Sequence, residues 1–270
     1  MSGKAPSAGV AVITGAASGI GAGLARHAVM RGMAVVLADW DEAGLAAIAG
    51  ELSGEVATLT IDVRKPSDLE ALADLAYSRF GQVDLVFNNA GVLSAGLAWE
   101  LTAETWQRVM DVNVMGVVNG IRAFVPRLLQ AGRPARIVNT ASVGGFFANG
   151  LMGPYFASKA AVVALSESLA HDLASAGGGV SVSVLAPGPV NTGILREEGG
   201  VGAKTMMERM RQLTKQHSAD PDSYAALIFD GIDQGQFWIV PQPEALDDRL
   251  KARTRMILDR QSPVAAMRKE

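Results

Sequence analysis

Short runs of apolar, largely β-branched residues alternate along this chain with longer runs of helical periodicity. There are seven short runs, at Val10–Ile13, Met33–Ala38, Ala57–Ile61, Val83–Phe87, Arg136–Asn139, Val180–Leu185 and Phe237–Val240. A short continuous apolar run is typical of a parallel strand that is buried on both faces. Helical segments fit between the runs, for example at Ile20–Met30, Pro66–Phe80, Ala103–Leu129 and Tyr155–Ser175.

The repeated order of strand and helix requires right-handed crossovers between parallel strands. It predicts a doubly wound α/β fold, with a seven-stranded parallel sheet and helices on both of its faces. No internal repeat, low-complexity segment or linker divides the 270 residues, so residues 1–270 are predicted to form a single domain. Thr102, ahead of Glu104, is typical of a helix start, whereas Gly32, Gly81 and Gly177 lie where helices should end.

Composition narrows the possible functions mainly by exclusion. The formal net charge is −3 and no basic run is present, which argues against nucleic acid and membrane surfaces as partners. The chain has no cysteine, so disulfides, cysteine nucleophiles and thiolate metal sites are excluded. The polar start of the chain lacks an apolar signal segment, and we expect a cytoplasmic protein.

A glycine-rich loop follows the first predicted strand. It reads Thr14-Gly15-Ala16-Ala17-Ser18-Gly19-Ile20-Gly21, with the spacing Gly-x3-Gly-x-Gly. Glycines let the backbone turn tightly and approach a pyrophosphate, and the next helix presents free N–H groups to it. An ordinary strand-to-helix turn is the simpler alternative, but the position between a first strand and a helix favours dinucleotide binding.

Asp39 ends the second predicted strand, 18 residues after the last glycine of the loop. A carboxylate at this distance accepts hydrogen bonds from ribose hydroxyls and repels a 2′-phosphate. Ser18 and Trp40, where a cation could receive that phosphate, are neutral. The sequence therefore favours NAD over NADP, although Asp39 could instead cap the helix that follows.

Three side chains form a candidate catalytic group. Tyr155 and Lys159 are four residues apart, so they lie on one face of a helix. Ser142 follows a predicted strand, and ligands of doubly wound sheets bind at the carboxyl ends of the strands. Tyr-x-x-x-Lys alone is common in helices, and its weight comes from its combination with the serine, the glycine loop and Asp39.

Taken together, these motifs resemble the short-chain dehydrogenase/reductase family, whose common members are single-domain NAD(P)-binding Rossmann proteins. The matching residues, which occur in the same order over most of the chain, are Thr14, Gly15, Gly19, Ile20, Gly21, Asp62, Val63, Asn88, Asn89, Ala90, Gly91, Asn113, Ser142, Tyr155, Lys159, Pro187, Gly188, Val190 and Thr192. Two further stretches, Gly116–Pro154 and Phe237–Pro243, resemble bacterial dehydrogenases of lignin-type aryl alcohols.

The resemblance implies four catalytic residues. Tyr155 would donate and accept the proton, and Lys159 would lower the pKa of the phenol and hold the nicotinamide ribose. Ser142 would polarise the substrate oxygen. Asn113 would support a water that links the lysine to bulk solvent.

The resemblance also implies a set of residues around NAD. Asp62 and Val63 would frame the adenine, and Val190 and Thr192 would contact the carboxamide. The full cofactor-binding set is Gly15, Ser18, Gly19, Ile20, Gly21, Asp39, Trp40, Asp62, Val63, Asn89, Ala90, Gly91, Tyr155, Lys159, Pro187, Gly188, Val190 and Thr192. No metal is required because the cofactor supplies the hydride chemistry, and His27, His171 and His217 have no ligand-like neighbours in the sequence.

Two segments favour a hydrophobic substrate. Met206, Met207, Met210 and Leu213 form an apolar stripe within residues 193–218, which we expect to be a substrate lid, although such a stripe also suits core packing. Phe146, Phe147, Leu151 and Met152 would form another wall. By the family resemblance, we expect a homotetramer or homodimer built on helices 103–129 and 155–175.

Two alternatives remain open from the sequence. The first is a non-catalytic NAD-binding sensor or scaffold on the same fold. It would be supported if no alcohol or ketone reacted. The second is an epimerase or dehydratase that retains its cofactor, which would show no net change in NADH.

Overall fold

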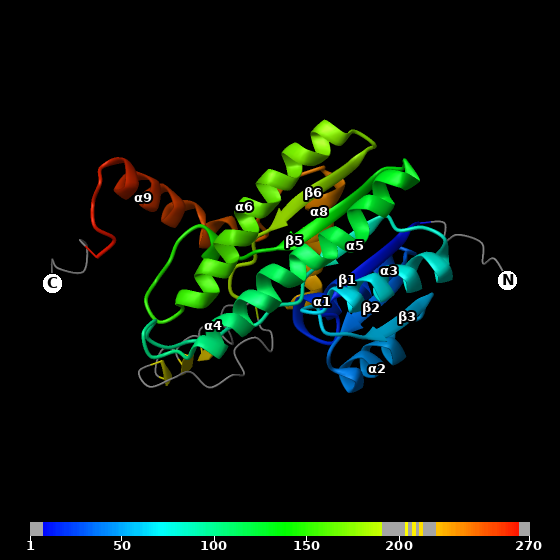
Figure 1. The fold of residues 1–270 in the computed structure, drawn as a ribbon, viewed down its shortest axis with the longest axis horizontal. Helices are drawn as coiled ribbons and strands as arrows, with labels where there is room; N and C mark the ends of the chain where they lie inside the picture. The colour runs from blue at the N-terminus through cyan, green and yellow to red at the C-terminus, as the bar shows by residue number, and fades with distance from the viewer. Residues whose placement is uncertain (1–7, 191–202, 205–206, 209–210, 213–219, 265–270) are drawn as a thin grey trace.

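The computed structural model describes residues 8–190, 203–204, 207–208, 211–212 and 220–264. A seven-stranded parallel sheet runs through the molecule in the order β3-β2-β1-β4-β5-β6-β7 (Figure 1). The strands are β1 (Val10–Thr14), β2 (Ala34–Asp39), β3 (Val56–Thr60), β4 (Leu85–Asn88), β5 (Ala135–Thr140), β6 (Val180–Leu185) and β7 (Trp238–Ile239). The predicted doubly wound Rossmann fold and its seven strands are confirmed, with strand ends shifted by one or two residues.

Helices cover both faces of this sheet. One face packs against α3 (Pro66–Phe80), α5 (Gly116–Ala131) and α6 (Gly153–Ala176). The other face packs against α1 (Gly19–Met30), α2 (Glu42–Glu51) and α8 (Pro221–Asp233). The remaining elements are α4 (Ala103–Met110), the turns η1 (Asp111–Met115), η2 (Val143–Gly145) and η4 (Pro243–Ala245), and α9 (Asp247–Leu258).

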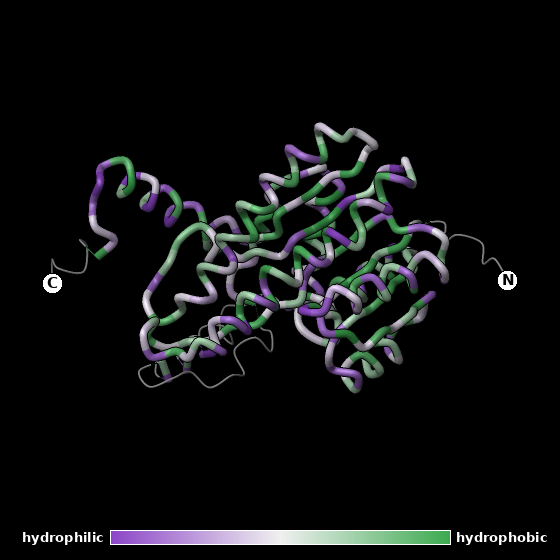
Figure 2. Tube along the Cα trace, viewed as in Figure 1, coloured by the Kyte–Doolittle hydropathy of each residue, from purple (hydrophilic) through white to green (hydrophobic). Residues whose placement is uncertain are grey.

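The central strand β1 shows why apolar runs without alternation form this sheet. Val10 and Val12 belong to the core on one face, and Ala11 and Ile13 belong to the core on the other. All four side chains are fully buried. Because both faces are covered, Val10–Ile13 does not alternate with polar residues, and Figure 2 shows apolar residues concentrated along the inner strands.

The helix ends follow local chemistry that the sequence predicts. Thr102 accepts a hydrogen bond from the backbone N–H of Thr105 at the start of α4. Gly81 ends α3 with a φ of 74°, a left-handed conformation that glycine adopts without steric cost. At α2 the cap is Asp41, whose side chain accepts from Gly44, so Asp39 is not the capping residue.

One expectation about the helices was wrong. The predicted helix Ala103–Leu129 is divided, because α4 and α5 are joined by the π-helical turn η1. A π-turn adds one residue to a helical turn, and such turns are frequent at functional sites. Asn113, which the sequence predicts to be catalytic, lies in its middle and is fully buried.

A chain of buried polar side chains joins the middle of the sheet to α6. Asn88 of β4 donates to the side chain of Asn139 on β5 at 2.9 Å, and Asn139 donates to Ser166 of α6 at 2.9 Å. Buried amides that are fully bonded fix register and orientation. The network therefore fixes the position of α6 relative to β5, from which the candidate catalytic residues extend.

Within the described residues, no helix combines the length and the apolar character that crossing a bilayer requires.

Candidate active site at the carboxyl ends of the strands

The glycine loop between β1 and α1 forms a tight cradle. Gly15 has a φ of 68°, and a Cβ on it would lie 2.8 Å from the Cα of Ala90. A Cβ on Gly21 would overlap the carbonyl oxygen of Gly15. Ser18, at the start of α1, makes no capping hydrogen bond, which leaves its hydroxyl and the first N–H groups of the helix available to an anion.

Thr14 and Asn89 fix the glycine loop to the neighbouring strand β4. The Thr14 hydroxyl donates to the carbonyl of Phe87 at 3.1 Å and accepts from the backbone N–H of Asn89 at 2.9 Å. The Asn89 amide donates to the carbonyl of Thr14 at 3.0 Å. The Asn89 side chain thus ties β1 to the segment after β4, which includes Ala90 and Gly91.

Asp39 lies at the carboxyl end of β2 and faces this loop. Its carboxylate accepts the backbone N–H of Ala17 at 3.0 Å and that of Asp41 at 3.1 Å. It therefore braces the glycine loop, and its two oxygens keep lone pairs for further donors. The neighbouring Trp40 is 76% exposed, which is unusual for an indole and leaves its face open to a ligand.

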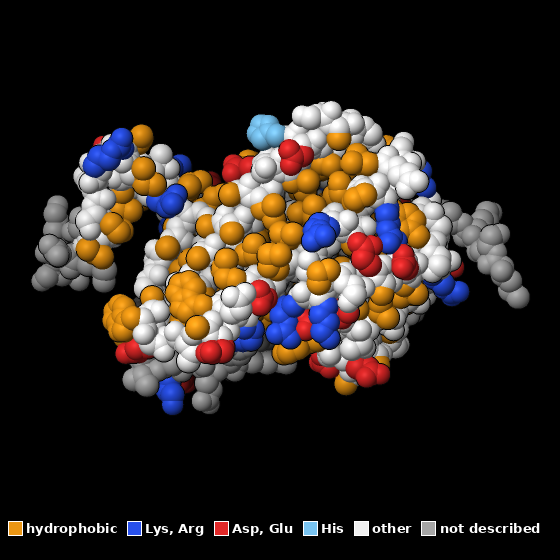
Figure 3. All heavy atoms as spheres, in the orientation of Figure 1, with side chains coloured by type: hydrophobic (Ala, Val, Ile, Leu, Met, Phe, Trp, Pro, Cys, Tyr) orange, Lys and Arg blue, Asp and Glu red, His pale blue; other side chains and the backbone are white. Residues whose placement is uncertain are grey.

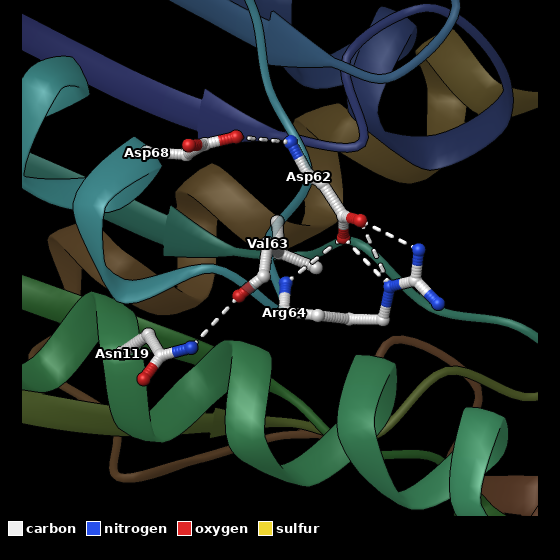
Figure 4. A network of polar contacts seen from close by, with 5 residues as sticks. All are labelled: Asp62, Val63, Arg64, Asp68 and Asn119. Atoms are coloured by element: carbon white, nitrogen blue, oxygen red, sulfur yellow. Dashed lines mark hydrogen bonds and ion pairs between the residues drawn. The ribbon is translucent and has the colours of Figure 1, made fainter.

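A second polar network follows β3 (Figure 4). The guanidinium of Arg64 donates to both carboxylate oxygens of Asp62, with the shortest distance at 2.6 Å. Arg64 therefore holds the pKa of Asp62 below its usual value. The backbone N–H of Asp62 donates to Asp68 at 3.0 Å, and the Asn119 amide donates to the carbonyl of Val63 at 2.9 Å.

Ser142 and Tyr155 meet at the carboxyl end of β5. Ser142 starts η2, where its Oγ accepts the N–H of Gly144 at 3.0 Å. Its hydroxyl donates to the carbonyl of Pro187 at 3.4 Å. Tyr155 lies in the first turn of α6, near enough for the Ser142 hydroxyl to lower the pKa of its phenol. Two hydroxyls side by side can hold one substrate oxygen between them.

Lys159 lies one helical turn after Tyr155 and is 3% exposed. Its Nζ donates to the carbonyl of Thr140 at 2.8 Å and lies 5.9 Å from the centroid of the Tyr155 ring. Burial lowers the pKa of Lys159 to about 8, because the charged form loses its hydration. A Cβ on Gly91 would lie 3.4 Å from Nζ, so this glycine keeps the crevice open beside the lysine.

The pKa of Tyr155 differs from the expectation. Burial of the phenol raises this pKa, and the hydrogen bond from Ser142 opposes the rise. The predicted lowering by Lys159 is therefore not seen in the protein alone, because the ammonium is bound to Thr140 and not directly to the phenol. A raised pKa keeps the hydroxyl protonated, as a proton donor requires.

Asn113 is oriented by three hydrogen bonds. Its Oδ1 accepts the backbone N–H of Val92 at 2.8 Å, and its amide donates to the carbonyl of Val92 and to the Ser158 hydroxyl, both at 2.9 Å. Ser158 in turn donates to the carbonyl of Tyr155 at 2.7 Å. The side chain of Asn113 thus links η1 to the first turn of α6.

An apolar cluster lies against Tyr155. Its buried members, which come from the segment after β4, the start of α6 and the part of residues 193–218 that is described, are Leu93, Ala95, Met152, Phe156, Ala203 and Met207. Phe147 lies close to Phe156, with ring centroids 6.4 Å apart, whereas Phe146 packs against Trp238 of β7. Of the predicted wall residues, Met152 therefore joins this cluster and Phe146 packs elsewhere.

The segment after β6 is held by a residue that the sequence analysis did not single out. The fully buried Tyr224 of α8 accepts the backbone N–H of Gly188 at 3.0 Å, and burial raises the pKa of its phenol. The carbonyl of Pro187 accepts the N–H of Val143 at 2.9 Å, which connects this segment to η2. Val190 is buried, whereas Thr192, Met206, Met210, Leu213 and His217 lie outside the described residues.

Other residues that sequence reasoning missed are Arg64, Thr140 and Ser158. Arg64 and Ser158 are each adjacent in sequence to a predicted residue, but only coordinates show their bonds. In the part of the chain that is described, no three His, Cys, Asp or Glu residues lie close enough together to hold a metal ion.

Comparison with known proteins agrees with this geometry. The family description "short chain dehydrogenase" matches residues 9–200. The chain belongs to the short-chain dehydrogenase/reductase family, and it is thus an oxidoreductase that acts on CH–OH groups with a nicotinamide dinucleotide.

Individual relatives cover most of the chain. A 1-deoxy-11-beta-hydroxypentalenate dehydrogenase of Streptomyces exfoliatus is 38% identical over 243 residues, which cover 87% of this chain and 83% of the relative. A C alpha-dehydrogenase of a Sphingobium species is 32% identical over 268 residues, covering 94% and 87%. A short-chain dehydrogenase/reductase of Burkholderia phymatum, crystallised with NAD, is 38% identical with a TM-score of 0.91, covering 94% and 96%. The predicted likeness to C-alpha dehydrogenases is confirmed.

Proposed function

We propose that this protein is an NAD-dependent dehydrogenase that interconverts a secondary alcohol and a ketone on a hydrophobic, cyclic or aromatic substrate. The observation that carries the proposal is the meeting of Ser142, at the carboxyl end of β5, with Tyr155 in the first turn of α6 and with the buried Lys159, whose Nζ lies 5.9 Å from the Tyr155 ring. These residues lie at the same sheet edge as the glycine cradle. A dinucleotide suits this loop because only glycine allows its tight turn, in which a Cβ at Gly15 or Gly21 would collide with Ala90 or with the Gly15 carbonyl, and the turn leads into the free N–H groups at the start of α1.

The residues divide the reaction between them. Ser142 holds the substrate oxygen and Tyr155 takes the hydroxyl proton of the alcohol, or returns it to the ketone. Lys159 places a cation one turn away, and Asn113 fixes the first turn of α6 through Ser158. When bound, the dinucleotide would accept or supply the hydride, and in the direction of ketone reduction the protonated Tyr155 phenol would give its proton to the substrate oxygen.

The preference for NAD is based on Asp39. Its carboxylate is fixed beside the loop by two backbone N–H groups, and it repels the 2′-phosphate of NADP. The Burkholderia relative with NAD supports the same choice. Asp62 and Val63 would frame the adenine, and Pro187, Gly188 and Val190 would border the nicotinamide.

The substrate class is inferred from the cluster around Tyr155. Its buried members are all apolar, and the described part of residues 193–218, at Ala203 and Met207, closes over it. We assign residues 193–218 the role of a lid on this basis. Two relatives are named for a hydroxypentalenate and for a C-alpha position, which suits a bulky carbon skeleton next to the reacting carbon.

We also propose that copies of the chain associate through α4, α5 and α6. Figure 3 shows apolar side chains gathered over these helices on the face towards the viewer. On α6, Ala160 and Ala164 are exposed, whereas Leu169 is buried in the core and belongs to the fold interior.

The test is Tyr155→Phe, assayed on alcohols and ketones of aryl and alicyclic type with NAD. Turnover should fall roughly 10²–10⁴-fold, the scale of lost acid–base catalysis. Binding of NAD, followed by quenching of tryptophan fluorescence, should change little. Normal turnover in the variant, or a wild-type protein that oxidises and reduces nothing in the panel, would overturn the proposal.

A further inference from the structure

The C-terminal helix α9 stands apart from the rest of the molecule. Figure 1 shows it extending outward from the body, beyond the start of α6. None of its residues is buried, and Ile257 and Leu258 are 51% and 69% exposed. We refer to residues 247–260 as the arm.

A helix of this size is not expected to be stable without a contact. It has 12 residues, and isolated helices shorter than about 12–15 residues are marginal in water. Leucine and isoleucine at its far end are exposed to water, and covering them with another apolar surface would stabilise the helix. The arm therefore needs a surface to pack on.

Among the residues that the structure describes, the rest of the same chain is poorly placed to provide that surface. The base of the arm is anchored, because Leu246 is 4% exposed and the Arg249 guanidinium lies 4.8 Å from the centroid of the Phe147 ring. From this base, 12 residues of α-helix reach about 18 Å outward. The far end cannot return to the body while the base stays attached.

Charge indicates what the arm would meet. It carries five basic residues (Arg249, Lys251, Arg253, Arg255 and Arg260) and three acidic ones (Asp247, Asp248 and Asp259), a net charge of +2. Because the whole chain carries −3, the remainder carries −5. The arm is thus complementary in charge to the body of another copy of the same chain.

The surface area that the arm could bury is also sufficient for a specific interface if each of two copies contributes an arm. Half of a cylinder about 18 Å long and about 10 Å wide offers roughly 300 Å². Two arms, each covered by an equal area of the other copy, would bury about 1,200 Å² in total, at the lower end of specific interfaces. A two-fold axis produces such a pair of identical contacts.

We propose that the arm packs on the body of a second copy of this chain, and that two copies exchange arms. The proposal does not depend on the cofactor or the reaction. It predicts that Leu258→Glu, at a position that is exposed in one copy, leaves the fold intact by circular dichroism and raises the dissociation constant of the assembly at least about 10-fold. Met30→Glu, at a residue of α1 that is 71% exposed, is the matched control and should change nothing.

The absence of cysteine in the chain allows a direct test of the contact. Thr254→Cys, labelled with benzophenone maleimide, is mixed with unlabelled chain grown in ¹⁵N, and the mixture is illuminated. We expect cross-linked peptides that join the arm of one isotope to the body of the other, and none from Met30→Cys treated in the same way. Cross-links confined to one chain or joining two arms, or an unchanged dissociation constant for Leu258→Glu, would overturn the proposal.

Discussion

The two ends of the crevice are built on opposite electrostatic principles. At the proposed catalytic end, Lys159 is buried and donates to the backbone carbonyl of Thr140, and Ser142 and Tyr155 lie close to each other. At the proposed adenosine end, Asp39 and Asp62 are partly exposed carboxylates, and Asp62 is paired with Arg64. The first end shifts pKa values by burial, whereas we propose that the second recognises the cofactor by charge.

The difference predicts how each end responds to substitution. Removing a group from a buried, preorganised site lowers the reaction rate, because water cannot take the place of the group that was removed. Removing a charge from a solvated edge weakens binding and selectivity. The effect should be smaller, because water screens the charge and can take the place of the lost group. The four variants below test this contrast.

Ser142→Ala should give the largest effect. It removes the hydroxyl that we propose polarises the substrate oxygen beside Tyr155, so turnover should fall roughly 10²–10³-fold. The KM for NAD should change little, because Ser142 lies at the substrate side. Steady-state kinetics at saturating NAD measure both; a loss confined to the KM for NAD would contradict the assignment.

Lys159→Met should lower turnover about 10²-fold and yet not weaken the fold. A pKa of about 8 in place of 10.5 corresponds to about 3 kcal/mol of unfavourable burial, which methionine avoids. Between about pH 8 and 10.5 the unfolded chain holds a proton that the folded chain has released, so wild-type stability gains with pH over this window. The advantage of the variant should be greatest below pH 8 and vanish by pH 10.5.

Urea unfolding of both proteins at pH 7 and pH 10 measures this difference. Tyr155 and Tyr224 titrate in both proteins, so their contributions cancel. A variant that is clearly less stable than wild type at pH 7 would show that the bond from Lys159 to Thr140 outweighs the cost of burying the charge.

Asp39→Asn should lower kcat/KM for NAD about 10-fold, because a charge-assisted hydrogen-bond acceptor is lost. It should also raise kcat/KM for NADP relative to that for NAD, because the 2′-phosphate is no longer repelled. Asp41→Asn is the matched control, since asparagine also caps helices and Asp41 bonds only Gly44. A wild-type enzyme that already prefers NADP would contradict our account of Asp39.

Arg64→Gln should give the smallest effect, a rise of about 2–5-fold in the KM for NAD. Its cost in stability should be under about 1 kcal/mol, because the pair is partly solvated. The pKa of Asp62 is lowered, so this contribution is present above the usual carboxyl pKa near 4 and is lost as pH falls below it. Thermal unfolding between pH 7 and pH 3, beside Arg127→Gln as a distant ion-pair control, tests the sign.

Much of the fold could be predicted because its signals are local. Each buried strand is a short apolar run, and caps such as Thr102 and Gly81 mark helix ends with their own chemistry. The edge strand β7 was harder, since only Trp238 and Ile239 pair with β6. The helices α2, α8 and α9 were not singled out from the sequence.

Residues of the candidate site could be predicted where a polar or charged side chain stands at a position that the fold does not itself require to be polar. Asp39 at a strand end and Tyr155 with Lys159 at helical spacing are such cases. What the sequence could not provide was the set of partners, because Thr140 acts through its backbone carbonyl and Tyr224 contacts Gly188 from 36 residues away. The raised pKa of Tyr155 likewise depends on packing by residues far apart in the chain.

The π-turn at η1 has a consequence for how the surface of this helical run should be interpreted. Each residue of an α-helix advances about 100° around the axis. The extra residue in η1 therefore rotates α4 by about that angle against α5, so positions that a helical wheel aligns across Asn113 point in different directions. Deleting Val112 would join α4 and α5 into one regular α-helix. The amide of Asn113 would then turn away from Val92, and the helix would no longer present it to the active site.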